Sequence, residues 1–438
     1  MKLNKLTTWI LIALVLGIAV GYLCNTMAPT PAAAKEIASY FSAVTDIFLR
    51  LVKMIIAPLV FATLVSGIAS LGDTKTVGRI GAKAMGWFLT ASLVSLALGL
   101  FWANVLQPGH GLQLPLPEAG AATNLKVSSL NFKDFIVNVF PKSIFDAMAG
   151  NSVLQIVVFS LFFGFALSAI KNKSGKTIIT SVEELVHVMI KVTDYVMLFA
   201  PVGVFAAVAA AITAQGLGVL VTYGKFMSSF YLGLASLWLV LAAVGYLFLK
   251  GRIFTLLGLV KEPTMIAFST SSSEAAYPKT IEQLEKFGVK DEVSGFVLPM
   301  GYAFNLDGSM MYMTFAILFI AQAYGVEMSF ATQLSMLLVL MVSSKGMAGV
   351  SRASLVVIAA TLPMFGLPEA GLLLIMGIDV FLDMGRSATN VIGNSIATAV
   401  VAKWEGKLGP MVSEAEPTVG QTTPQPVPAA RKRSEAVV

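Results

Sequence analysis

Long apolar stretches without charged residues recur along the first 250 positions of the chain. About 20 apolar residues are enough to span a bilayer as a helix. Six stretches reach that length, and they are residues 6–34, 54–72, 84–117, 147–170, 195–224 and 226–249. Backbone groups in lipid must be satisfied within their own segment, so the pattern predicts helices rather than strands. Parts of the first, third and fifth stretches are too rich in Pro and Gly to be helical throughout.

Basic residues lie between these stretches in an alternating pattern. They are concentrated at Lys2 and Lys5, at Lys75, Arg79 and Lys83, at Lys171, Lys173 and Lys176, and at Lys250, Arg252 and Lys261. Cytoplasmic loops carry an excess of Lys and Arg. The pattern therefore predicts a multi-pass membrane protein with both termini in the cytoplasm. Residues 409–438, which are rich in Pro, Thr, Ala and Glu, are typical of a disordered cytoplasmic tail.

Beyond residue 255 the apolar segments become shorter and contain polar residues. Two such segments centre on residues 269–274 and 343–349. Paired broken segments of this kind are typical of a transporter site. We expect re-entrant hairpins at about 256–290 and 330–368, although ordinary interhelical loops are an alternative. A helix at about 292–325 is interrupted at Asn305–Gly308, where freed carbonyls could bind a cation beside Asp307.

The last helix, at about 369–405, carries most of the polar side chains of this region. They are Asp379, Asp383, Arg386, Asn390 and Asn394, at successive gaps of four, three, four and four residues. At 3.6 residues per turn they share one face, which we call the polar stripe. A charged side chain in the bilayer costs at least about 2.5–3.5 kcal/mol, so the stripe must face partners, water or a ligand. Asp383 and Arg386 could simply pair with each other.

The chemistry of the stripe favours a small acidic amino acid as its ligand. Arg386 offers a planar fork for a carboxylate. Asp383 can hold an ammonium group, and the hydroxyls of Ser272 and Ser273 can hold a second carboxylate. An intramembrane aspartyl protease using Asp307 and Asp379 is a competing interpretation. It leaves Asp383 and Arg386 without a role, so we expect a transporter and not an enzyme.

Composition narrows the class further. Only 12% of the residues are charged and 56% are hydrophobic, and the mean hydropathy is +0.81. These values exclude an ordinary soluble or disordered protein. The net charge of +6 is too dilute for a nucleic-acid surface, and the single Cys24 gives no redox information.

These motifs together resemble one known family. The motifs are Ser272-Ser273, Asn305-Leu306-Asp307-Gly308, Ala348-Gly349-Val350 and the stripe from Asp379 to Asn394. They are similar to the dicarboxylate/amino acid:cation symporters, which include excitatory amino acid transporters, and most of all to the proton-coupled bacterial glutamate/aspartate symporters. The resemblance implies an all-α fold of eight transmembrane helices and two re-entrant hairpins, built from inverted repeats. It also implies a homotrimer and an elevator mechanism. Residues 1–255 would hold the scaffold, with the third and sixth helices moving with a transport core at 256–408.

The resemblance also implies roles for individual residues. Substrate would be bound by Ser272, Ser273, Ser309, Gly349, Val350, Asp383, Arg386, Ser387 and Asn390. In that assignment Arg386 and Ser309 hold the side-chain carboxylate, and Asp383 holds the amino group. Asn390 and Ser273 hold the α-carboxylate. Arg352 stands where many relatives have Gly, which leaves the choice among glutamate, aspartate and C4-dicarboxylates open.

Coupling is where the chain departs from its sodium-coupled relatives. They carry an Asp in place of Asn394, and a Tyr and a Thr in place of Phe88 and Ala91. Each change removes oxygen ligands that a hard cation needs. We therefore expect proton coupling, with no cofactor. The candidates for cation coupling are Glu274, Gly301, Asn305, Asp307, Asp379 and Asn394. If sodium is used instead, its ligands would be Asn305, Asp307, Asn390 and Asn394. A sodium-coupled C4-dicarboxylate or neutral amino acid symporter is the alternative within the family.

Overall fold

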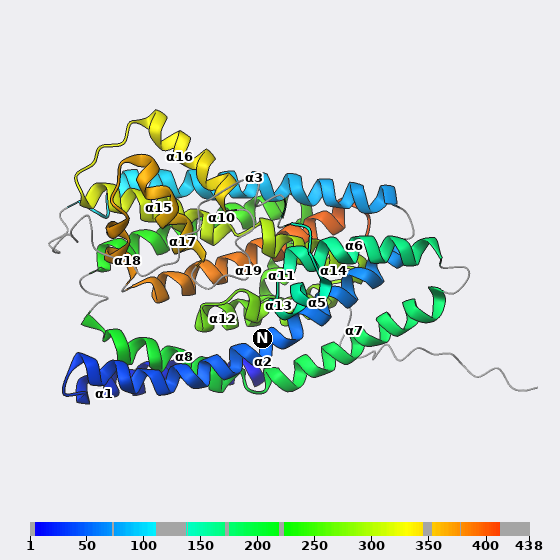
Figure 1. Cartoon of the computed structure of the whole chain (residues 1–438), viewed down its shortest axis with the longest axis horizontal. Coiled ribbons are helices and arrows are strands. Elements are labelled where there is room, and N and C mark those ends of the chain that lie inside the picture. The colour runs from blue at the N-terminus through cyan, green and yellow to red at the C-terminus, as the bar shows by residue number, and fades with distance from the viewer. Residues whose placement is uncertain are drawn as a thin grey trace, which may run out of the picture.

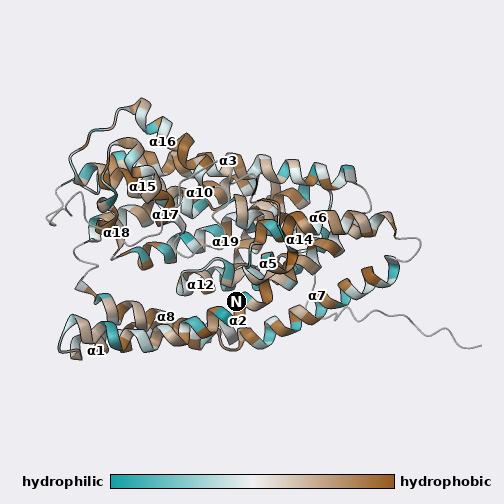
Figure 2. Cartoon of the chain, viewed as in Figure 1, coloured by the Kyte–Doolittle hydropathy of each residue, from teal (hydrophilic) through white to brown (hydrophobic). Residues whose placement is uncertain are grey.

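The computed structural model describes residues 5–71, 74–110, 137, 139–170, 175–218, 223–344, 353–376 and 378–411. Every element in these ranges is helical, apart from one isolated bridge between Val289 and Leu408. Figure 1 shows most of the long helices running along the longest axis of the molecule. Figure 2 shows that many of them are hydrophobic over much of their length. The chain is thus an all-helical, multi-pass membrane protein.

One layer contains the N-terminal helices and two later ones. It is formed by α1 (Lys5–Met27), α2 (Pro31–Leu71), α7 (Gly175–Met197) and α8 (Ala200–Gln215), with α5 (Ile144–Ala149) and α6 (Val153–Ala169) beside α2. Helices α1 and α8 pack closely, since a Cβ atom added at Gly17 would lie 2.8 Å from the carbonyl oxygen of Phe205. In Figure 1, α1 and α8 lie along one edge of the molecule with α2 rising from them across the bundle.

The second layer surrounds the last helix. It contains α3 (Thr74–Leu106), α10 (Gly224–Leu249), α14 (Asp291–Phe304), α15 (Asp307–Ala323) and α19 (Asp379–Trp404). Helix α19 packs on α10, α12, α14 and α15. Its central part is buried on every side, so its polar side chains face protein rather than lipid.

Two segments consist of short helices separated by turns, in the regions where the sequence predicts re-entrant hairpins. The first comprises α11 (Arg252–Leu259), α12 (Lys261–Thr270), η1 (Glu274–Ala276) and α13 (Tyr277–Phe287). The chain turns at Ser271, whose φ of +51° ends α12, and α13 then packs back against α11 and α12. The second comprises α16 (Phe330–Ser343), α17 (Ala353–Thr361) and η2 (Leu362–Phe365), followed by η3 (Glu369–Leu372) and α18 (Leu373–Met376). The expected tip of the second hairpin lies outside the described residues.

The boundaries of the expected spans differ from those observed. Helix α2 runs through residues 35–53, which the charge-free pattern left outside any span. The charged residues there interrupt the apolar run without interrupting the helix, because Lys35, Glu36 and Arg50 are exposed. By length and hydropathy, five described helices could cross a membrane, or up to seven when each bent pair is one span. Helix α19 is too polar to be among them. Its 26 residues extend about 39 Å, which is nevertheless longer than the bilayer core of about 30 Å.

Ionic contacts join the ends of the helices at one end of the bundle. Glu405, directly after α19, contacts Arg79 at 2.8 Å and Lys83 at 2.6 Å, both on α3. The basic side chains hold the pKa of Glu405 below its ordinary value, chiefly through the hydrogen bonds from Arg79. The chain then returns to the α13–α14 turn, where the N–H of Gly409 donates to the carbonyl of Gly288 at 2.8 Å. Of the expected tail, residues 412–438 lie outside the described residues.

Candidate substrate site

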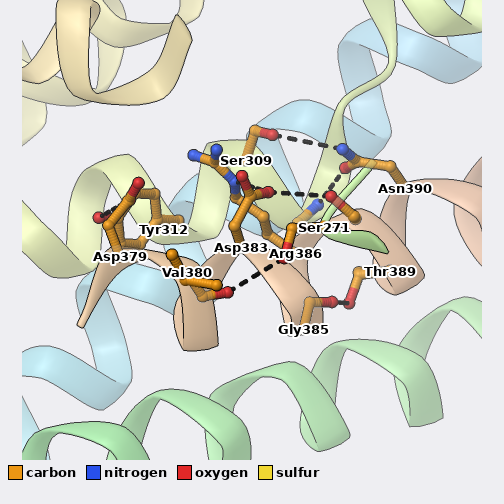
Figure 3. A network of polar contacts seen from close by, with 12 residues as sticks. Ser271, Ser309, Tyr312, Asp379, Val380, Asp383, Gly385, Arg386, Thr389 and Asn390 are labelled. Atoms are coloured by element: carbon orange, nitrogen blue, oxygen red, sulfur yellow. Dashed lines mark hydrogen bonds and ion pairs between the residues drawn. The ribbon is translucent and has the colours of Figure 1, made fainter. Parts of the chain in front are cut away.

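Four of the five side chains in the polar stripe of α19 are buried in the protein interior, and Asp383 is partly buried. Asp379 is 1% exposed, Arg386 is 5% exposed, and Asn390 and Asn394 are buried as well. Figure 3 shows Asp379, Asp383, Arg386 and Asn390 of the stripe beside Ser309 and Tyr312 from α15. The structure thus places the five stripe residues on one face of a single helix, among partners from other helices.

Asp383 and Arg386 form an ion pair within the stripe. The Nε–H of Arg386 donates to Oδ1 of Asp383 at 2.6 Å, and the hydroxyl of Ser387 donates to the same oxygen at 2.9 Å. The guanidinium also lies over the ring of Tyr312, 5.1 Å from its centroid. Its Nη1 is buried and has no hydrogen-bond partner among the described residues. The pairing that the spacing left open does form, yet part of the guanidinium remains unpaired.

Asn390 connects the stripe to the break between α14 and α15. The N–H of Gly308 donates to Oδ1 of Asn390 at 2.9 Å, and Nδ2 of Asn390 donates to the hydroxyl of Ser309 at 3.3 Å. The first N–H groups of a helix lack partners within it, so the start of α15 can supply this donor. A Cβ atom at Gly308 would overlap the backbone carbonyl of Arg386, so only glycine allows this approach.

A second polar cluster lies one turn further along α19. Nδ2 of Asn305 donates to Oδ2 of Asp307 at 3.0 Å and to Oδ1 of Asn394 at 3.1 Å. The hydroxyl of Ser95, on α3, donates to Oδ1 of Asp307 at 3.4 Å. Oδ1 of Asn305 and Nδ2 of Asn394 are buried without a hydrogen-bond partner among the described residues. A Cβ atom at Gly301 would overlap the Asn394 amide, so the lack of a side chain at Gly301 makes room for Asn394.

Two residues of these clusters were not expected from the sequence. The hydroxyl of Tyr312 donates to Oδ1 of Asp379 at 2.8 Å, in addition to its contact with Arg386. Tyr312 lies three residues after Ser309, on the same face of α15, and that spacing was the available signal. Ser95 lies seven residues after Phe88, on the same face of α3. Phe88 was already singled out because sodium-coupled relatives carry a Tyr there, so the helical spacing pointed to Ser95 as well.

The tip of the first hairpin reaches α19 through a different serine from those expected. The hydroxyl of Ser271 donates to the carbonyl of Val380 at 3.2 Å. Ser272 instead accepts the N–H of Ala275 at 3.2 Å, within its own turn. No hydrogen bond joins Ser272 or Ser273 to α19 in the described part of the chain. Glu274 begins η1 at this tip. Of the expected substrate residues, Gly349 and Val350 lie outside the described residues, as does Arg352.

A buried stripe of this kind, beside a broken helix and a re-entrant hairpin, agrees with a family match over residues 6–404 to the sodium:dicarboxylate symporter family. The chain belongs to that family. A proton/sodium-glutamate symport protein of Bacillus caldotenax is 40% identical over 404 residues, which cover 91% of this chain and 94% of the relative. A C4-dicarboxylate transport protein of Citrifermentans bemidjiense is 41% identical over 406 residues, which cover 91% and 90%.

Membership of the sodium:dicarboxylate symporter family confirms the expected class. The protein is a symporter for a small molecule and not an enzyme. The names of the relatives include both glutamate and C4-dicarboxylates as substrates, and both protons and sodium as coupling ions. The names of the relatives therefore do not identify the substrate or the coupling ion of this chain, and both must be inferred from its own residues.

Proposed function

We propose that this symporter imports glutamate or aspartate together with protons across the bacterial inner membrane. Its termini would lie in the cytoplasm. Residues 256–408 would carry the substrate as an elevator against a scaffold formed mainly by residues 1–255, within a homotrimer. The observation that carries the substrate assignment is the buried guanidinium of Arg386, whose Nη1 has no partner among the described residues.

Arg386 is suited to the side-chain carboxylate of an acidic amino acid. An unpaired buried donor costs about 1–3 kcal/mol, and a carboxylate would satisfy it with a charge-assisted hydrogen bond. The ring of Tyr312 holds the guanidinium from one side. The hydroxyl of Ser309 lies on α15 beside Asn390, where it can complete the same carboxylate pocket.

Asp383 is suited to the amino group of the substrate. It lies one turn before Arg386, and Ser387 fixes its Oδ1. A substrate that carries both an acidic group and an ammonium group satisfies both members of this ion pair. Asn390 and Ser273 are assigned to the α-carboxylate, with Ser272, Ser387, Gly349 and Val350 completing the pocket.

Proton coupling is supported by the ligands around Asp307. Asn394 is an amide where sodium-coupled relatives carry a carboxylate, and Phe88 and Ala91 lack the oxygens of their Tyr and Thr, so the cluster offers sodium less negative charge and fewer oxygens than theirs. The carboxylates that could carry the proton are Glu274, Asp307 and Asp379. Gly301, Asn305 and Asn394 shape the cluster around Asp307.

Purified protein in liposomes tests this proposal. We expect uptake of labelled glutamate or aspartate when the interior is made alkaline, with no sodium present. Uptake that needs a sodium gradient and ignores the pH gradient would contradict the coupling assignment alone. Competition by unlabelled succinate, glutamate and aspartate then ranks the substrates.

Transport of a C4-dicarboxylate is the second candidate function. It is favoured by the ion pair itself, because Arg386 already neutralises Asp383 without an ammonium group from the substrate. The competition panel separates the two candidates. Strong competition by succinate and none by glutamate would select the dicarboxylate.

A further inference from the structure

A cavity of about 510 Å³ lies on the far side of α19 from the polar stripe. One wall is formed by α1, α2 and α8, and the other by the end of α12, the start of α19 and part of α10. In Figure 1 these two groups of helices face each other across the lower part of the molecule. Most of the lining is apolar, including Leu14, Ile212, Met227, Phe381 and Met384. None of the stripe residues lines it, although Ser271 and Val380, which join the hairpin tip to α19, do.

Hydrophilic groups enter this apolar space from both walls. Ser42, Thr45 and Asp46 are on one face of α2, at spacings of three and four residues, and Ser269 is on the opposite wall. Asp46 forms no hydrogen bond or ion pair with any described residue. Ser269 is 3% exposed, and its hydroxyl has no partner among the described residues.

Other charged groups do not neutralise Asp46 in the described structure. Arg50 lies one turn further along α2, but it does not line the cavity and makes no ion pair with Asp46 within 4 Å. Asp46 is exposed and lines the cavity, and its negative charge favours a cationic ligand beside it. Anionic ligands are disfavoured there for the same reason.

The cation that suits this cavity is organic rather than metallic. A hard metal ion needs about six oxygen ligands, and the cavity supplies one carboxylate and a few hydroxyls. The described residues contain no group of three or more His, Cys, Asp or Glu that could hold a metal. An alkyl ammonium satisfies both features, since its head binds a carboxylate and its chain covers apolar side chains.

We propose that this cavity is a binding site for small apolar amines. The ammonium group binds Asp46, with the hydroxyls of Ser42 and Ser269 as further acceptors. The alkyl chain lies against Leu14, Met227 and Phe381. A bound amine contacts both groups of helices and therefore ties α1, α2 and α8 to α12 and α19.

Three probes of equal chain length test the charge requirement. They are n-octylamine, 1-octanol and octanoate, added to the purified full-length protein in nanodiscs of zwitterionic lipid near pH 7. The amine is then protonated, because an alkyl ammonium titrates near the Lys value of about 10.4. Saturable binding, read by ligand-observed NMR, is expected for octylamine at a concentration at least tenfold lower than for octanol or octanoate.

Two variants of the cavity and one control locate the site. Asp46→Asn is expected to weaken octylamine binding at least tenfold and leave octanol binding unchanged. Ala211→Leu, which narrows the cavity while keeping the charge, is expected to weaken both probes. Glu36→Gln removes an exposed carboxylate elsewhere on α2 and is expected to change neither.

Specific outcomes overturn the proposal. Equal binding of all three probes would mean that the cavity is an apolar gap filled by lipid. Octylamine binding that survives both Asp46→Asn and Ala211→Leu would place the amine elsewhere on the protein. Binding is measured without a transport substrate, so either result leaves the proposed transport function standing.

Discussion

Replacing Arg386 by Lys tests the core of the substrate assignment. The substitution keeps a positive charge beside Asp383 but removes the planar fork. An Arg386→Ala change would also abolish uptake of acidic substrates, yet it would leave a largely buried Asp383 without its partner. Breaking a buried pair in that way costs about 3–5 kcal/mol of stability, so the Lys variant separates binding from folding.

The expected loss follows from the contacts of the guanidinium. Nε donates to Asp383, and Nη1, which has no hydrogen-bond partner among the described residues, can bind substrate. Lys has one nitrogen and cannot reach both partners in the same geometry. One hydrogen bond to a charged group contributes about 1.5–3 kcal/mol. With about 1.4 kcal/mol for each factor of ten, glutamate should bind roughly 10- to 100-fold more weakly.

Calorimetric titration of purified protein with glutamate measures this loss. Arg252→Lys is the matched control, because Arg252 donates to the carbonyls of Phe287 and Gly409 at the opposite end of the core. We expect the control to bind glutamate normally. Unchanged glutamate affinity in Arg386→Lys, with normal folding, would remove Arg386 from the substrate site.

Three further substitutions test the packing and charges around the site. Gly301→Ala places a methyl group against the amide of Asn394, and overpacking of this kind should lower the free energy of unfolding by about 1–3 kcal/mol, read by thermal denaturation. Tyr312→Phe removes the donor to Asp379 and should cost about 1.5–3 kcal/mol in the same assay. Glu405→Gln should lower the melting temperature near pH 7 but not at acidic pH. The pKa of Glu405 is lowered in the folded state, so its ion pairs stabilise the protein above its ordinary pKa of 4.5 and are lost as the pH falls through the lowered value.

A control variant, a second substitution and a change of pH check these three predictions in turn. Gly78→Ala, on α3 with no atom within 4 Å of the added methyl, should be neutral or slightly stabilising. If it destabilises as much as Gly301→Ala, overlap with Asn394 is not the cause. Tyr312→Leu should cost more than Tyr312→Phe, because it also removes the ring beneath the guanidinium. A melting-temperature difference for Glu405→Gln that persists at pH 3 would contradict the ion-pair argument.

The periodicity of polar residues was sufficient to place the stripe. Asp379, Asp383, Arg386, Asn390 and Asn394 share a face because helical geometry is local, and the structure shows four of them buried and Asp383 partly buried. The break at Asn305–Gly308 was expected for the same local reason, and α14 ends at Phe304 while α15 begins at Asp307. The extent of α2 was not foreseen, since charged residues within a long helix can be exposed without ending it.

The sequence by itself determined the membrane class, the family and the face of the last helix that carries the charges. These follow from local hydropathy and from a spacing that depends only on the rise and turn of an α-helix. The tertiary structure alone decided that Tyr312 supports Asp379, that Ser95 reaches Asp307, and that Ser271 is the hairpin serine that contacts α19. Those contacts join residues that are 67 to 212 positions apart in the sequence. Packing between helices brings them together, and no local sequence pattern encodes that packing.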